Sequence, residues 1–135
     1  MRRKITTVAG TIAAAAALTV AMSGSAYATS GIVGCSTTGA YGDMAYTNYH
    51  GPAATIGLKF SLEDTLADKN GVRIRLVSRD VKGAVHYWPW RTHGSGTVST
   101  WKTTASHDRG LFEIAVEVAR FYPNGKLRNS CIDWS

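Results

Sequence analysis

The chain has 135 residues, a hydrophobic content of 44% and a formal net charge of +6 from 15 basic and 9 acidic side chains. This length holds a single domain, and this balance of apolar and charged residues is that of a globular protein rather than a disordered one. Fourteen glycines and no heptad pattern exclude a coiled coil and argue against a helical bundle. A large catalytic domain with its own cofactor fold does not fit in this length.

The first 28 residues have the three parts of a secretory signal peptide. Residues 2–4 are basic, residues 8–22 are apolar and rich in alanine, and residues 26–28 read Ala-Tyr-Ala. The alternative is a membrane anchor, but the apolar run is short for a span and no basic stop-transfer segment follows it. Cleavage after Ala28 predicts a secreted, extracellular protein that begins at Thr29. Loss of the three basic residues leaves no basic stripe for nucleic acid.

The mature part contains two cysteines, Cys35 and Cys131. An even number of cysteines in an exported chain predicts a disulfide, and in a monomer only one pairing exists. A redox-active or metal-binding pair is the alternative, but it lacks the spacing of a Cys-x-x-Cys motif.

Residues 29–42 are small and polar, with one apolar pair, Ile32-Val33, and no periodicity. We interpret this segment as an extended N-terminal arm that Cys35 holds to the domain; a frayed terminus is the alternative. An extended segment of this kind can add main-chain hydrogen bonds to a partner's cleft. The predicted partner-binding residues of the arm are Thr29, Ser30, Gly31, Ile32, Val33 and Gly34.

Residues 43–135 are expected to form one domain of short strands. Alternation of apolar and polar residues, or β-prone composition, marks six runs: 53–62, 72–78, 84–88, 97–103, 112–121 and 127–134. Turn signals separate several of them, with Asn-Gly at 70–71 and again at 124–125 indicating hairpins. A helix is possible for 112–121, but its β-branched residues favour a strand. We therefore predict an all-β fold, an antiparallel β-sandwich of about six to eight short strands.

Motifs that carry chemistry are missing from the sequence. There is no Gly-x-Ser-x-Gly elbow and no calcium-loop pattern around Gly71. The histidines do not follow the spacings of zinc ligands; they are His50, His86, His93 and His107. We expect loop histidines, no catalytic residue, no metal, no cofactor and no enzymatic activity.

Four tryptophans lie towards the C-terminus, and two of them flank Pro89. Strand alternation would place Trp88 and Trp90 on one face and Tyr87 on the other, so at least one of the two tryptophans should be half exposed or more. Exposed aromatic side chains are typical of protein interfaces and of sugar-binding surfaces. Trp88 and Trp90 are therefore predicted to bind a partner; the alternative is that they cap the core under a loop.

Several short features together resemble one family of secreted proteins. They are the export signal, one cysteine near each end of the mature chain, the run Asp-Thr-Leu-Ala-Asp-Lys-Asn-Gly-Val at 64–72 before an alternating strand, and Gly-Ser-Gly-Thr at 94–97 before Trp101. The chain resembles the adaptor (B-type) subunits of the umbrella toxin particles of filamentous soil bacteria. It departs from related domains with more cysteines in having Val118-Ala119 where a further cysteine would stand.

The resemblance implies a non-enzymatic adaptor in an antibacterial toxin complex. In that family, an N-terminal extension of the adaptor inserts into a lectin-bearing subunit, and the β-domain docks on a large toxin-bearing subunit. Residues 29–42 correspond to the extension. Two other functions remain open: a carbohydrate-binding module that uses Trp88, Trp90 and Trp101, and, ranked third, a small secreted protease inhibitor.

Overall fold

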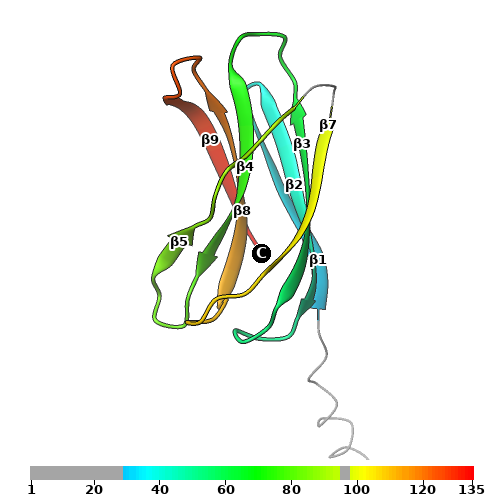
Figure 1. The fold of residues 1–135 in the computed structure, drawn as a ribbon, viewed down its shortest axis with the longest axis vertical. Coiled ribbons are helices and arrows are strands. Elements are labelled where there is room, and N and C mark those ends of the chain that lie inside the picture. The colour runs from blue at the N-terminus through cyan, green and yellow to red at the C-terminus, as the bar shows by residue number, and fades with distance from the viewer. Residues whose placement is uncertain (1–28, 95–97) are drawn as a thin grey trace, which may run out of the picture.

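The computed structural model describes residues 29–94 and 98–135; the expected signal peptide, residues 1–28, and the loop residues 95–97 lie outside the described residues. Within the described part, the chain is all β and forms two antiparallel sheets that pack face to face (Figure 1). This arrangement confirms the predicted β-sandwich.

Nine strands make up the two sheets over the described residues. Sheet A has the order β1-β2-β3-β7, with β1 at Thr29–Thr37, β2 at Ala40–Tyr49, β3 at Ile56–Asp64 and β7 at Val98–Ala105. Sheet B has the order β5-β4-β8-β9, with β5 at Val85–Tyr87, β4 at Gly71–Arg79, β8 at Glu113–Phe121 and β9 at Leu127–Trp134. The short strand β6 (Arg91–Thr92) pairs with β4 beside Arg73 and Ile74.

The N-terminal segment differs from the expected arm. It is extended, as predicted, but residues 29–37 are strand β1 and residues 40–42 already belong to β2, so both lie within sheet A. The sandwich therefore includes residues 29–42, which were expected to lie outside it. Val33 is only 6% exposed and belongs to the core, which is why this segment packs on its own domain.

Strand β2 was not among the predicted strands, because glycine and alanine hide its alternation. Its inward positions are Ala40, Gly42, Met44 and Tyr46. A Cβ at Gly42 would lie 2.9 Å from both Ile74 Cδ1 and Val118 Cγ2 of sheet B. Glycine stands here because the two sheets approach closely at this point.

The two Asn-Gly turn signals have different outcomes. Residues 65–70 connect β3 to β4, and these strands belong to different sheets, so the predicted hairpin at Asn70-Gly71 is wrong and the segment is a crossing between sheets. Residues 122–126 join β8 to β9, which pair directly, and Gly125 has φ 86°. Turn residues specify a change of chain direction, but not whether the next strand pairs with the previous one.

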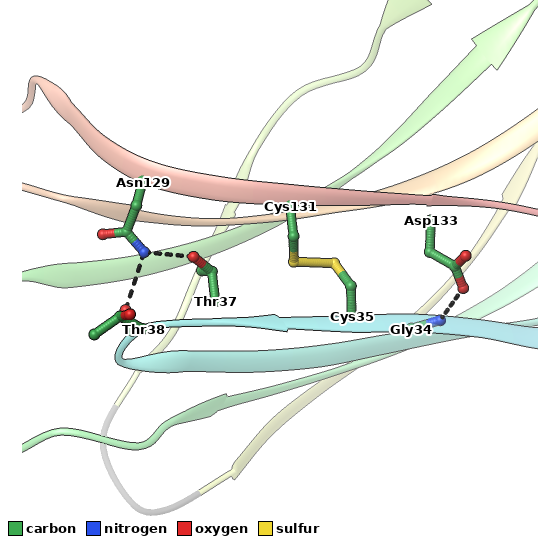
Figure 2. The surroundings of a disulfide bond; sticks show 7 residues. All are labelled: Gly34, Cys35, Thr37, Thr38, Asn129, Cys131 and Asp133. Carbon is green, nitrogen blue, oxygen red and sulfur yellow. Dashed lines mark hydrogen bonds between the residues drawn. A yellow bond between two sulfur atoms is a disulfide. The ribbon is translucent and has the colours of Figure 1, made fainter.

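The disulfide Cys35–Cys131 confirms the predicted pairing and closes one edge of the sandwich (Figure 2). It joins β1 of sheet A to β9 of sheet B, with the two Cα atoms 6.2 Å apart. On either side of it, the Gly34 N–H donates to Asp133 Oδ2 at 3.0 Å, and Asn129 Nδ2 donates to Thr37 Oγ1 at 2.7 Å (Figure 2). Edge strands β1 and β9 are thus fastened along three consecutive contacts.

Candidate functional site

The predicted partner-binding residues lie at opposite edges of the sandwich. Thr29 to Gly34 belong to edge strand β1, on the disulfide side. Trp88 and Trp90 lie between β5 and β6, next to edge strand β7. The sequence thus marked two separate surfaces, and the structure does not bring them together.

On the β1 edge, the six predicted residues have different surroundings. Val33 points into the core, whereas Ile32 is 65% exposed on the outer face. Gly31 lies under Tyr46, whose hydroxyl oxygen would be 2.5 Å from a Cβ at that position. Thr29 donates its hydroxyl to the carbonyl of Tyr49 at 2.8 Å. Ile32 is therefore the apolar side chain that this edge presents to a partner.

Trp88 and Trp90 do not share a face, and neither is half exposed, so both expectations for this segment are wrong. Trp88 packs against the core, and its indole N–H donates to the hydroxyl of buried Ser78 at 2.9 Å. Trp90 lies on the outer face of sheet B, with its ring centroid 3.9 Å from Arg75 Cζ. The alternation fails because residues 88–90 belong to no strand and Pro89 interrupts the pairing to β4.

The outer face of sheet B carries a row of arginines stacked on aromatic rings. Three outward residues of β4 take part: Arg73 covers Phe121 at 4.2 Å, Arg75 lies between Tyr87 at 4.6 Å and Trp90, and Arg79 covers Trp134 at 4.9 Å.

Two of these arginines also form ion pairs on the same face, Arg75 with Glu117 and Arg79 with Glu113. These stacked side chains shield Val77, Ala115 and Ala119, which are fully buried although no further sheet of the described residues packs on this face.

A groove opens at the edge between residues 88–91 and β7. Its cavity volume is about 230 Å³. Leu58, Phe60 and Leu76 from the core line it, together with both predicted tryptophans, Trp88 and Trp90, and, from β7, Thr103 to Ala105. Arg91 stands over Phe60, with 5.7 Å between Cζ and the ring centroid. An apolar cleft with one cation suits a ligand that is itself apolar and negatively charged.

A second hollow adjoins the groove on the outer face of sheet A. The two share Leu58 and Thr103, and Lys59 and Lys102 also line the second hollow. These lysines are direct cross-strand neighbours in the β3–β7 pair, an arrangement of like charges that costs stability. Among the residues that the structure describes, no acidic side chain lines either hollow.

The histidines do not assemble a metal site. In the described residues, no group of three or more His, Cys, Asp or Glu side chains is placed to hold a metal ion. His86 and His107 stack with ring centroids 4.3 Å apart, and His86 Nε2 lies 2.9 Å from Oδ2 of the buried Asp80. The hydrogen bond from His86, with those from the backbone N–H groups of Ala84 and Lys82, lowers the pKa of Asp80 to about 2.

These contacts make Asp80 the anchor of the turn between β4 and β5. Its Oδ1 accepts from Lys82 N at 2.9 Å and from Ala84 N at 3.0 Å. The carboxylate thus holds a tight turn in place. Next to this turn, His107 lines an open hollow together with Lys82, Asp108 and Arg109.

Sequence reasoning missed the groove and its cations. Arg91, Lys59 and Lys102 were not singled out, because they come from three strands whose neighbourhood depends on the sheet order. Arg91 stands immediately after Trp90, but the break in alternation at Pro89 hid that it faces the groove. The only sequence signal was the aromatic cluster at 87–90, which marks the correct edge.

Comparison of the chain with known proteins found no family model, no curated protein and no solved structure that matches it. Over the described residues, there is no helix long and apolar enough to cross a membrane.

Proposed function

We propose that this protein is a non-enzymatic secreted adaptor that holds two other proteins together. The observation that carries the proposal is that two surfaces suited to protein binding lie at opposite edges of one sandwich, which a disulfide closes. One is the β1 edge with exposed Ile32, and the other is the groove beside β7. A protein that bridges two partners needs two surfaces that both partners can occupy without touching each other.

The rigidity of the frame supports this function. The disulfide and its flanking hydrogen bonds fasten one edge, and the stacked arginines stiffen the outer face of sheet B. Binding to a preformed surface avoids the cost of ordering a loop. Such a frame fixes the distance and orientation between two bound partners.

The resemblance to the umbrella toxin adaptors suggests which partners these are. In this proposal, a lectin-bearing subunit binds the β1 edge and a large toxin-bearing subunit binds the sandwich elsewhere, in an antibacterial complex outside the cell. The β1 edge takes the role expected for the arm, but as a strand of the domain rather than as a free extension.

The carbohydrate-binding alternative needs a flat strip of exposed aromatic rings. Trp88 and Trp90 both line the groove beside β7, but each is partly buried, and Trp101 packs against the core from sheet A. The three rings therefore share no platform on which a sugar chain would stack. The inhibitor alternative needs a braced, exposed loop, whereas Cys35–Cys131 joins two strands.

The test is affinity purification of the secreted protein from its native medium, with mass spectrometry of its companions. Ile32→Asp should lose one companion, and Arg91→Glu should lose a different one. Leu66→Asp, an exposed apolar residue in the β3–β4 crossing, is the matched control and should keep both. Point substitutions replace a truncation here, because removal of β1 would also remove Val33 from the core.

Two results would contradict the adaptor. Wild-type protein that purifies without companions has no partners to bridge. If either single variant lost both companions, both companions would depend on the same surface, and the protein would not bridge them from two sides. A pull-down on polysaccharides, with retention that depends on Trp90, would favour the carbohydrate-binding alternative.

A further inference from the structure

We propose that the groove beside β7 receives an acidic segment of a protein partner, with one apolar side chain on the core floor and a carboxylate on Arg91. This inference deepens the proposed adaptor function and rests on it. It names the chemistry of one of the two partners.

The size of the groove fits a side chain rather than a whole small molecule. Pockets for drug-sized ligands hold about 300–1,000 Å³, whereas this cavity holds about 230 Å³. Its floor is three core side chains, Leu58, Phe60 and Leu76, which are at most 5% exposed. A small apolar cleft that reaches the core at a sheet edge is a place for one inserted apolar side chain.

The charge around the groove fits a carboxylate. Arg91 has a ring contact with Phe60 but no acidic partner within the described residues. Lys59 and Lys102 also have no acidic partner there. Two other arginines of β4 are neutralised, Arg75 by Glu117 and Arg79 by Glu113, whereas Arg73 covers the ring of Phe121 and does not line the groove. Arginine presents a planar fork of donors that matches a carboxylate, so Arg91 is the specific contact and the two lysines add attraction.

A protein segment fits this site better than an anionic polysaccharide. The polysaccharide would need an exposed ring on which to stack, but both tryptophans that line the groove are partly buried: Trp88 is hydrogen-bonded to Ser78, and Arg75 covers Trp90. A sugar chain would also leave the apolar floor without apolar contacts. A side chain such as leucine, next to glutamate or aspartate, matches both parts of the groove.

The test is titration of the secreted protein, disulfide intact, with three short capped peptides. The first contains leucine followed by two glutamates, the second replaces the glutamates by lysines, and the third replaces the leucine by serine. Binding is followed by the backbone NMR signals of Thr103 and Thr104 and by tryptophan fluorescence. The first peptide should bind saturably at millimolar concentration or below, and each of the others at least about tenfold more weakly.

Arg91→Gln is the test variant and Arg128→Gln the matched control, because Arg128 is an exposed arginine that does not line the groove. Arg91→Gln should weaken the first peptide about tenfold, Arg128→Gln should leave it unchanged, and both should unfold at the wild-type denaturant concentration. No saturable binding, equal binding of the lysine peptide, or an unaffected Arg91→Gln variant would overturn the inference. If a polyanionic polysaccharide displaced the peptide, and if its binding were lost on substitution of Leu58 or Arg91, the groove would be a sugar-binding site instead.

The two proposals fail in different ways. If the native protein captures two companions but no acidic peptide binds, the groove inference is wrong and the adaptor function stands. If the peptide binds as expected but the native protein purifies alone, the groove is an acidic-segment site on a protein that does not bridge partners.

Discussion

Oδ2 of the buried Asp80 and Nε2 of His86 lie 2.9 Å apart. This contact spans the turn from β4 to β5, because Asp80 stands at its start and His86 lies just beyond its end. Asp80 follows directly after β4 and has no exposed surface, and His86 is the central residue of β5. The contact places β5 and the residues that follow it, Trp88 to Arg91, against β4. The groove wall therefore depends on a charged hydrogen bond at the far end of the turn.

The first prediction concerns the dependence of folding stability on acid. The pKa of Asp80 is about 2 in the folded protein and about 3.8 in the unfolded chain, so the fold favours the ionised carboxylate. The stabilisation is present above about pH 4 and is lost as the pH falls from 4 towards 2. Asp80→Asn should lower the unfolding temperature at pH 6 and should flatten its decline between pH 4 and pH 2.

Thermal unfolding followed by circular dichroism over pH 2–6 measures this effect. Asp108→Asn is the control, since its side chain is 92% exposed, and it should keep the wild-type pH profile. A wild-type slope in the Asp80→Asn variant would show that other carboxylates carry the acid sensitivity.

The second prediction concerns the hydrogen bond that holds Trp88 inside. Trp88→Phe removes the indole donor of the buried Ser78 hydroxyl and should lower the free energy of unfolding by about 1–3 kcal/mol. In a Ser78→Ala background, the same substitution should cost less, because the hydroxyl is already gone. Guanidinium denaturation of the four proteins of this cycle gives the coupling.

Trp101→Phe removes a similar volume from a ring of the other sheet that packs against the core, and it should show no coupling to Ser78→Ala. If Trp88→Phe is equally costly with and without Ser78, the effect is packing alone and the hydrogen bond does not position the groove wall.

The sequence predicted the class of fold because that information is local. Alternation in β4 and β8 and the turn at 122–126 each depend on a few neighbouring residues, and the two cysteines permitted one pairing. The arm was mistaken for a separate segment because its own composition is polar. Its partner β2 hides an apolar face behind Gly42, a glycine that only the opposing sheet explains.

The candidate site was beyond local reasoning for a different reason. Arg91, Lys59 and Lys102 meet around the groove only because β7 closes sheet A next to the β5–β6 edge of sheet B. Sheet order is set by packing over the whole chain, and no short pattern encodes it. The exposed-aromatic rule did mark the correct edge. It expected at least one of Trp88 and Trp90 to be half exposed, whereas Ser78 holds Trp88 against the core and Arg75 covers Trp90.

The third prediction concerns the disulfide. Cys35 and Cys131 are 96 residues apart in sequence, and closing a loop of this size stabilises the fold by about 4–5 kcal/mol in the chain-entropy model. The Cys35→Ala/Cys131→Ala double variant should lose a large part of this free energy of unfolding, which urea denaturation measures. Reduced wild-type protein should match the double variant. A loss below about 1 kcal/mol would mean that the native hydrogen bonds of Figure 2 alone hold β1 to β9.

The last prediction tests the close approach of the two sheets at Gly42. A Cβ there would meet Ile74 Cδ1 and Val118 Cγ2, each at 2.9 Å, and neither neighbour can move far because both are fully buried. Gly42→Ala should therefore lower the free energy of unfolding by about 1–3 kcal/mol, the range for overpacked cores. Gly71→Ala is the control: nothing lies within 4 Å of its Cβ position, so it should be neutral or stabilise by up to about 1 kcal/mol. Chemical denaturation measures the free energy of unfolding of both variants. If Gly42→Ala is as stable as Gly71→Ala, β2 and sheet B do not approach each other as closely as this packing requires.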